Sequence, residues 1–275
     1  MRYLFLLLFL TFPAILLSQE GIILEKIEFF ERGYEAPKEE ITYATDFSKE
    51  NTRYIWTRVF VQNLFYQKTD QSHLVLFRYY NPYDSLIAEF TATLNIKREQ
   101  EKAYASRGWG WEEPGRWKNG IYRVEVYIDE IFMGEKQFII IEQKYLQPAE
   151  QTVELIKIKF WESPESGLEI NKRVYTNKFL KSKTRYINTT LEIKNLQYGI
   201  SDNTVNLYLK YYLPDGTLWE IPKISVVIEQ DWEYAEIYNG CGFSEPGFFE
   251  PGTYRVEVHY CGEIFAVGYF TITTQ

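Results

Sequence analysis

Residues 108–138, GWGWEEPGRWKNGIYRVEVYIDEIFMGEKQF, decide the fold of this chain because a second version of them occupies its C-terminal end. The segment YRVEV at residues 122–126 recurs at residues 254–258, a spacing of 132 residues. Further matches keep that spacing: TRYI at residues 52–55 and 184–187, NL at 63–64 and 195–196, and YY at 79–80 and 211–212. Two copies are too few for a solenoid, so the duplication predicts two tandem domains.

The comparison of the copies also indicates which face of a strand is buried. Within residues 54–61 the odd-numbered positions stay short or branched in both copies: Ile55, Thr57, Val59 and Val61 answer to Ile187, Thr189, Leu191 and Ile193. The intervening aromatic positions change more: Tyr54, Trp56 and Phe60 answer to Tyr186, Asn188 and Glu192. Because side chains alternate across a strand, the first set predicts the core face and the second set the outer face.

The composition predicts an all-β protein. Aromatic residues make up 18% of the 275 residues, and with frequent Ile, Val and Thr they favour strands over helices. Each copy contains six or seven short segments of period two, separated by turn residues, which predicts a two-sheet antiparallel sandwich. A polar stretch at residues 143–152 separates the copies, so we expect one domain over residues 19–145 and another over residues 146–275.

The end of each copy carries a more specific pattern. The motif G-x-Y-R-V-E-V, followed by a short turn and a closing strand that ends in F-x-I, resembles bacterial secreted immunoglobulin-like domains. The resemblance implies two tandem immunoglobulin-like sandwiches with a Gly-x-Tyr corner, whose tyrosine hydroxyl ties the preceding loop to the sheet. Gly120 and Tyr122 hold those positions in the first copy, and Gly252 and Tyr254 in the second. A shared fold implies no activity.

The N-terminal segment predicts export. Residues 1–18, MRYLFLLLFLTFPAILLS, combine one cation with a short apolar run and a small residue, as a secretory signal peptide does, with cleavage expected after Ser18. A retained membrane anchor is the competing interpretation, because about 20 apolar residues can span a bilayer. The shortness of the run and Pro13 within it favour the signal peptide. We therefore expect a secreted, periplasmic or cell-surface bacterial protein that contacts a membrane only through an uncleaved N-terminus, if at all.

The net charge and the cysteines lead to two further expectations, one about binding partners and one about a disulfide. A net charge of −8 argues against binding to nucleic acid, which needs a basic face to displace counterions from phosphates. Cys241 and Cys261 are the two cysteines, and an isolated pair in an exported protein predicts a disulfide. Two unpaired thiols remain the alternative, since spacing alone does not show that the Cα atoms lie within about 7 Å.

The tryptophan-rich run suggests a ligand platform, but the second copy favours a structural role for most of it. Trp111 and Trp117 answer to Phe243 and Phe249, so aromatic side chains at those positions predict plugs for the end of each sandwich. Trp109 answers to Cys241 and escapes that argument. For Trp109 a ligand contact and a structural role stay equally open.

The sequence contains no recognisable catalytic constellation. His73 and His259 are the two histidines, and neither has a Cys or His at metal-ligand spacing. Nucleophile elbows, zinc-protease motifs, phosphate-binding glycine loops and EF-hand spacing are all missing. We therefore predict a non-enzymatic protein with no catalytic residue, metal or cofactor.

The outer-face difference between the copies gives the binding hypothesis. Three aromatic residues on an exposed strand face are unusual in a monomer, so another strand, a loop, the sister domain or an external partner is expected to cover them. We predict that Tyr54, Trp56, Phe60 and Trp109 contribute to binding an unknown protein partner or envelope component. A carbohydrate-binding module is the alternative, if Trp56, Trp109 or Trp219 lie exposed and coplanar in one groove. An enzyme would require convergent carboxylates in a pocket.

Overall fold

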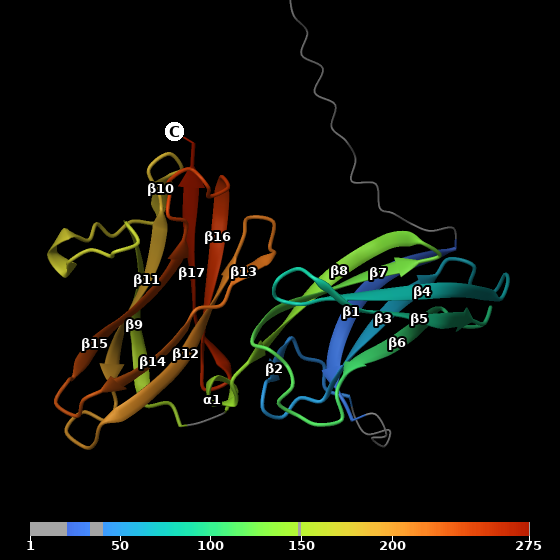
Figure 1. Ribbon diagram of the computed structural model, residues 1–275, viewed down its shortest axis with the longest axis horizontal. Helices are drawn as coiled ribbons and strands as arrows, with labels where there is room; N and C mark the ends of the chain where they lie inside the picture. Colours follow the sequence, from blue (N-terminus) through green and yellow to red (C-terminus); the bar gives the residue numbers. More distant parts are fainter. Residues whose placement is uncertain (1–20, 34–40, 148–149, 275) are drawn as a thin grey trace, which may run out of the picture.

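The computed structural model describes residues 21–33, 41–147 and 150–274, which form two antiparallel β-sandwiches joined by a short helix, α1 (Gln143–Leu146). The all-β, two-sandwich prediction is confirmed (Figure 1). The predicted signal peptide, residues 1–18, lies outside the described residues. No helix within the described ranges is long and apolar enough to cross a membrane.

The first sandwich pairs a three-stranded sheet with a five-stranded sheet. Its strands are β1 (Ile22–Glu31), β2 (Asp46–Ser48), β3 (Tyr54–Asn63), β4 (Gln71–Tyr80), β5 (Leu86–Ile96), β6 (Lys102–Gly110), β7 (Gly120–Ile128) and β8 (Ile131–Ile141). The sheet orders are β1-β3-β6 and β2-β8-β7-β4-β5. Strand β2 runs parallel to β8, whereas the other pairs are antiparallel. This is an immunoglobulin-like arrangement, in which the chain crosses between sheets after its first strand.

The second sandwich repeats this order. Its strands are β9 (Val153–Ser163), β10 (Lys178–Leu180), β11 (Tyr186–Asn195), β12 (Asn203–Tyr212), β13 (Leu218–Glu220), β14 (Lys223–Ile228), β15 (Tyr234–Gly242), β16 (Gly252–Tyr260) and β17 (Glu263–Thr273). The sheets are β9-β11-β15 and β10-β17-β16-β12, with β13 and β14 both paired to β12. Together β13 and β14 replace the single edge strand β5, because Pro222 lies between them and removes a backbone donor.

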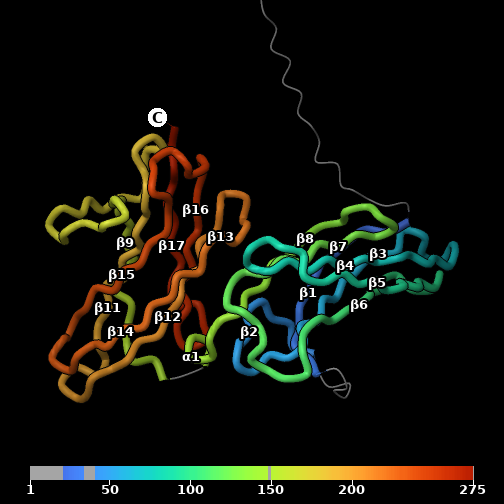
Figure 2. The backbone as a smooth tube through the Cα atoms, in the orientation of Figure 1, coloured from blue at the N-terminus to red at the C-terminus, as the bar shows by residue number. Residues whose placement is uncertain are grey.

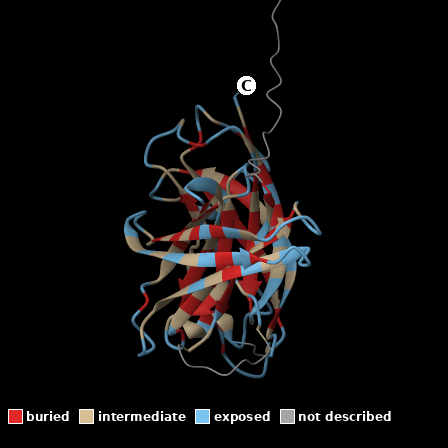
Figure 3. Ribbon diagram, turned by 90° about the vertical axis from the view of Figure 1, so that its right-hand side faces the viewer, coloured by how far each residue is buried: buried red, intermediate tan, exposed pale blue. Residues whose placement is uncertain are grey.

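Each sandwich has its own core. In β3 the odd-numbered residues are fully buried and the even-numbered residues are half-buried, so the predicted core face is confirmed. Figure 3 shows the same alternation of buried and exposed segments along the strands. Inside the first core the Tyr79 hydroxyl lies 2.8 Å from the Thr57 hydroxyl and donates to the backbone oxygen of Arg107. Tyr211 and Thr189 repeat that buried link between the sheets of the second sandwich.

The tyrosine corner is built identically in both copies. The Tyr122 hydroxyl donates to the Lys118 backbone oxygen at 3.1 Å and accepts from the Lys118 backbone N–H. Tyr254 makes the same two bonds to the backbone of Glu250. Gly120 and Gly252 precede the tyrosines with φ of 139° and 141°, a region that suits glycine. A Cβ on either glycine would also lie within 2.6 Å of the proline in the preceding hairpin.

The two sandwiches pack against each other through a separate apolar cluster. Ile139, Ile141 and Tyr145 of the first sandwich and its helix contact Tyr208 and Leu218 of the second. Figure 2 follows the chain from β8 through α1 into β9 at this junction. The contact therefore joins the β2–β8 end of the first sandwich to the outer face of the six-stranded sheet of the second.

Polar groups complete the junction. Asp46 accepts hydrogen bonds from the Lys210 ammonium at 2.6 Å and from the Tyr208 hydroxyl at 2.7 Å. Burial by itself would raise the pKa of Asp46, but Lys210 and Tyr208 outweigh it and the pKa is lowered. The Gln137 side chain binds both the N–H and the oxygen of Leu218, so that it acts as a backbone partner for β13.

The expected disulfide is absent: Cys241, at the end of β15, and Cys261, just after β16, are both free thiols. Cys241 lies in the core near Tyr254, close to the start of β16, and burial raises the pKa of its thiol well above the usual range. Cys261 follows the end of β16 in a turn with φ of 53°. A strand rises about 3.3 Å per residue, so these ends are roughly 20 Å apart, far beyond the reach of a disulfide.

Candidate functional site

The outer surface of the three-stranded sheet of the first sandwich gathers aromatic rings around an arginine. We call this surface the aromatic face and define it by six residues: Phe30 on β1, Trp56, Arg58 and Phe60 on β3, Tyr104 on β6, and Tyr43 from the loop before β2. The register places Trp56 opposite Phe30 and Phe60 opposite Tyr104. Alternation along three adjacent strands therefore brings the rings together on one side of the sheet.

Trp56 is held flat against the sheet. Its ring stacks on Phe30 at 6.1 Å with an interplanar angle of 16°, and its indole N–H donates to the backbone oxygen of Arg32 at 3.3 Å. On the neighbouring strand a Cβ at Gly108 would lie 2.6 Å from the Trp56 ring, so glycine makes room for it. The ring is thus fixed and half-buried, as an interface anchor has to be.

Arg58 forms the centre of the aromatic face. Its guanidinium lies 5.0 Å from the ring centre of Phe30 and 4.4 Å from that of Tyr104. It donates to the Tyr43 hydroxyl at 2.9 Å and to the Ser106 hydroxyl at 3.0 Å. Cation–π contacts and neutral acceptors, rather than a carboxylate, hold this cation in place.

Lys26 extends the face along β1. Its ammonium lies 4.8 Å from the ring centre of Phe60 and 5.7 Å from that of Tyr43. Tyr43 meets Phe60 edge-on at 74°, and Phe60 meets Tyr104 at 50°. The rings are therefore tilted relative to one another, with cations over several of them. That geometry does not provide the coplanar platform on which a sugar ring stacks.

The equivalent surface of the second sandwich carries ion pairs and an arginine inserted from its own chain. A loop after β9 inserts Arg173, which is 4% exposed and lies 4.3 Å from the Trp161 ring centre and 4.4 Å from that of Tyr238. Glu236 approaches Arg173 at 3.9 Å and pairs with Lys159 at 2.9 Å. The positions of Phe60 and Tyr104 are thus taken by Glu192, which also pairs with Lys159, and by Glu236.

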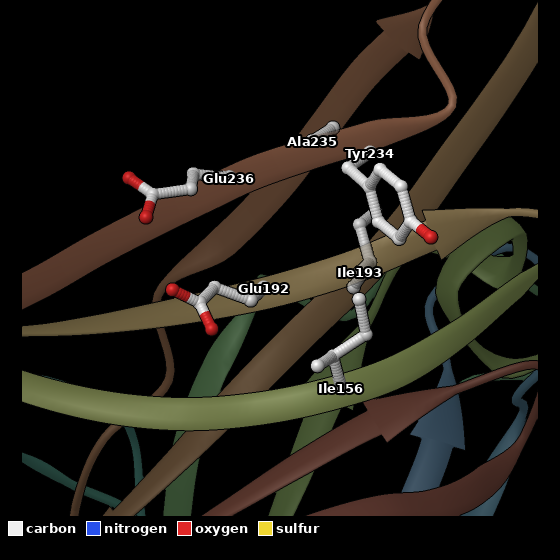
Figure 4. Close-up of a pocket in the computed structure, with 6 residues that line it drawn as sticks. All are labelled: Ile156, Glu192, Ile193, Tyr234, Ala235 and Glu236. Carbon is white, nitrogen blue, oxygen red and sulfur yellow. The ribbon is translucent and has the colours of Figure 1, made fainter.

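A shallow pocket of about 350 Å³ lies on that second surface, between β9, β11 and β15. Figure 4 shows the carboxylates of Glu192 and Glu236 on neighbouring strands, with Tyr234 over Ile193 and Ile156. Both carboxylates form ion pairs with Lys159. Among the described residues no group of His, Cys, Asp and Glu is arranged to hold a metal ion.

The structure separates the residues predicted for binding. Trp56 and Phe60 lie together on the aromatic face, whereas Tyr54 lies at the first position of β3, opposite Gly110. Trp109 points to the other side of the sheet and packs against Trp117 at 4.8 Å and Trp111 at 4.7 Å. It plugs the end of the first core, as Trp111 and Trp117 do.

The condition for a carbohydrate site is not met. Trp219 belongs to the second sandwich, where it stacks on Phe243 at 5.6 Å. Trp56, on the outer face, and Trp109, in the first core, lie in two further environments. These three tryptophans therefore do not form one groove.

Sequence reasoning missed Tyr43, Arg58 and Tyr104. Tyr43 could have been found, because Tyr175 occupies the same place 132 residues later and pairs with the backbone of Trp161. Tyr104 carried the same signal as Phe60, an aromatic residue where the second copy has an acid. Arg58 gave no signal alone, since a single cation on an outer strand face usually belongs to a solvated surface.

The two histidines lie in different buried surroundings. His73 is buried, with Nδ1 2.8 Å from an Asp129 carboxylate oxygen and Nε2 3.2 Å from the Gln71 side-chain oxygen. Both ring nitrogens are therefore engaged with polar side chains, as in a structural link. His259 faces outward from its own sheet, but it lies at the domain junction and is 7% exposed.

Comparison with known proteins identifies no family. No family model matches the chain, and no curated protein matches it significantly. Solved structures that resemble it include an immunoglobulin-like protein from Pseudomonas aeruginosa, with 16% identity and a TM-score of 0.28, covering 45% of this chain and 99% of that one. A red sea bream transglutaminase has 10% identity and a TM-score of 0.30, covering 94% of this chain and 32% of that one.

The alkylpurine DNA glycosylase AlkC of Pseudomonas fluorescens, bound to DNA with an abasic site analogue, is also similar. It has 12% identity and a TM-score of 0.29, covering 46% of this chain and 31% of that one. The chain thus spans about a third of the length of the glycosylase and the transglutaminase. Likeness at this level concerns all-β architecture and says nothing about activity.

Proposed function

We propose that this chain is an exported, non-catalytic binding protein that recognises a protein partner through the aromatic face of its first sandwich. The observation that carries the proposal is the difference between the two copies of that surface. In the second sandwich, ion pairs and an inserted arginine of the same chain satisfy the surface. In the first, Phe60 and Tyr104 take the places of Glu192 and Glu236, and the Arg58 guanidinium lies over the Tyr104 ring rather than beside a carboxylate.

The residue types support a protein partner. Protein interfaces are enriched in Trp, Tyr, Phe and Arg at their centres, and the residues that dominate binding energy are most often Trp, Tyr and Arg. The aromatic face combines all four types on three hydrogen-bonded strands. Rigid strands hold such residues in fixed rotamers, which lowers the entropy lost on binding.

Site-specific photo-cross-linking tests the proposal in the native cell envelope. A photoreactive phenylalanine at position 104 should form a discrete cross-linked adduct with a second protein, and the Trp56→Ala variant should lose that adduct. The matched control carries the probe at position 236, the equivalent place on the second sandwich. Equal adducts from both positions, or an adduct that survives Trp56→Ala, would contradict the proposal.

A further inference from the structure

The aromatic face lacks the carboxylates that neutralise its counterpart. In the second sandwich Glu192 and Glu236 balance Lys159 and Arg173. In the first sandwich Phe60 and Tyr104 stand at those two positions, and both cations of the face lie over aromatic rings instead. The exchange of two acids for two aromatic residues converts a surface of internal ion pairs into one of cation–π contacts.

The acid that lies beside Arg58 on this surface is already engaged. Glu28 lies opposite Arg58 on β1, but its carboxylate pairs with Lys136 at 2.8 Å and with Lys26 at 3.4 Å. Within the described part of the chain, Arg58 forms no ion pair. Lys26 and Lys136 therefore share the Glu28 carboxylate, which leaves Arg58 without a carboxylate among the described residues. Around Glu28, three described cations thus face one carboxylate in a protein whose net charge is −8.

We infer that the partner segment bound by the aromatic face presents an aspartate or glutamate side chain to Arg58, flanked by apolar side chains that pack on Trp56 and Phe60. This inference rests on the proposed function and specifies the chemistry of the partner. The partner carboxylate takes the role that Glu236 has in the second sandwich. A carboxylate at an arginine that is already fixed by Tyr43 and Ser106 gains charge-assisted hydrogen bonds without ordering a flexible side chain.

The inference can be tested by phage display. Random linear peptides are selected for binding to this protein after it has been purified. Peptides captured through the aromatic face, identified by loss of binding to Trp56→Ala, should share an acidic residue between apolar residues. Replacing that acid by its amide in a synthetic peptide should weaken binding at least about tenfold. Raising the salt concentration should also weaken it, because part of the attraction is electrostatic.

Variants at position 104 supply a matched pair. Tyr104→Glu supplies the carboxylate found at Glu236, which neutralises Arg58 and repels an acidic peptide. Tyr104→Gln has nearly the same size and no charge. We expect Tyr104→Glu to bind the selected peptides at least about tenfold more weakly than Tyr104→Gln does. Since Tyr104 is 58% exposed, both variants should keep the native melting temperature.

The outcomes separate this inference from the proposed function. Peptides that depend on Trp56 but contain no shared acid, or that bind the Glu and Gln variants equally, overturn the carboxylate inference and leave the aromatic face standing as a binding surface. If native chain and Trp56→Ala select the same peptides, the aromatic face is not the binding surface and both proposals fail.

Discussion

The two sandwiches present the same end and the same sheet face, yet in each case one copy is docked and the other is not. At the docked end of the first sandwich, Ile121, Ile139 and Ile141 contribute to the junction; the same positions in the second sandwich are Thr253, Thr271 and Thr273. Asp46, which pairs with Lys210, is replaced by the exposed Lys178. The covered end of the first sandwich is thus apolar and contains a buried ion pair. The free end of the second sandwich has threonines and a lysine at the same positions.

The sheet faces show the same contrast. On the second sandwich, Lys210 is 5% exposed and takes its carboxylate from the other domain. On the first, the equivalent Arg78 pairs within its own sheet with Glu89 at 2.7 Å. Ile221 of the junction stands where the first sandwich has Glu89. The contact between the end of one sandwich and the sheet face of the other therefore forms once. The free end of the second sandwich and the free face of the first lack the side chains needed to form it again.

The largest expected effect comes from breaking the ion pair of the junction. Lys210→Ala leaves the Asp46 carboxylate buried without its cation, so the free energy of unfolding should fall by about 3 kcal/mol. Arg78→Ala, the matched control, removes a partly exposed pair and should cost less than about 1 kcal/mol. Urea denaturation measures both. Similar losses of unfolding free energy in the two variants would show that the junction ion pair stabilises the protein no more than the exposed pair does.

The next effect comes from giving the docked end a residue of the free end. Ile141→Thr introduces the residue of position 273 into the apolar cluster, and the lost packing should cost about 2 kcal/mol. The control, Thr273→Val, removes a half-buried hydroxyl that donates to the Phe179 backbone oxygen at 3.3 Å and should cost less than about 1 kcal/mol. Limited proteolysis should cut between the domains faster only in Ile141→Thr, and unchanged cleavage would contradict a role in docking.

A smaller effect concerns pH. Burial and then the nearby Lys210 lower the pKa of His259, which stacks on Tyr208 at 4.7 Å and lies 3.2 Å from a Glu257 carboxylate oxygen. A neutral histidine in the folded state that protonates when unfolded contributes stability above pH 6.5, and this contribution is lost as the pH falls below it. Asp46 has a lowered pKa, so its own contribution is lost only below about pH 3.8.

The pH effect can be assigned by mutation. Melting temperatures of the native chain should fall between pH 7 and pH 5, and His259→Gln should have a flatter profile over that range. A profile unchanged by His259→Gln would show that the junction does not couple to this histidine.

The smallest expected effect is weak self-association, produced by giving the free end and the free sheet face the side chains found at the junction. The combined variant Glu89→Ile, Lys178→Asp, Thr271→Ile and Thr273→Ile gives the free face an unpaired Arg78 and the free end an acid with two apolar side chains. We expect weak head-to-tail association, with Kd on the order of 1 mM, about −4 kcal/mol. Sedimentation velocity at increasing protein concentration measures it. A chain that stays monomeric throughout would show that these four positions do not determine the contact.

The fold was predictable from the sequence because the duplication removes ambiguity. Side chains at Ile55 and Ile187, or at Val124 and Val256, stay apolar in both copies only if they face a core. The junction was not predictable in this way. Tyr208, Lys210 and His259 follow the same outward alternation as Leu76, Arg78 and Tyr127, and only the packing of the other domain buries them.

The candidate site was predictable in part. Trp56 and Phe60 stood out because the copies disagree there, and the structure places them on one face. Trp109 was assigned to binding because its counterpart is Cys241, yet both pack in a core, since the end of each sandwich can be filled by different side chains. The predicted disulfide is wrong, because the sequence spacing of Cys241 and Cys261 does not show how far apart the two thiols lie in the folded protein.

Pro222 has a consequence for how two such similar copies fold without exchanging strands. Tandem domains with matching sequences are prone to misassembly in which a strand of one copy pairs inside the other. Strand β5 pairs with all ten residues of β4, whereas residues 218–228 reach β12 as two short pieces on either side of Pro222. A segment broken in this way cannot complete the longer ladder, because proline lacks the backbone donor. We therefore expect each edge strand to pair preferentially within its own sandwich during folding.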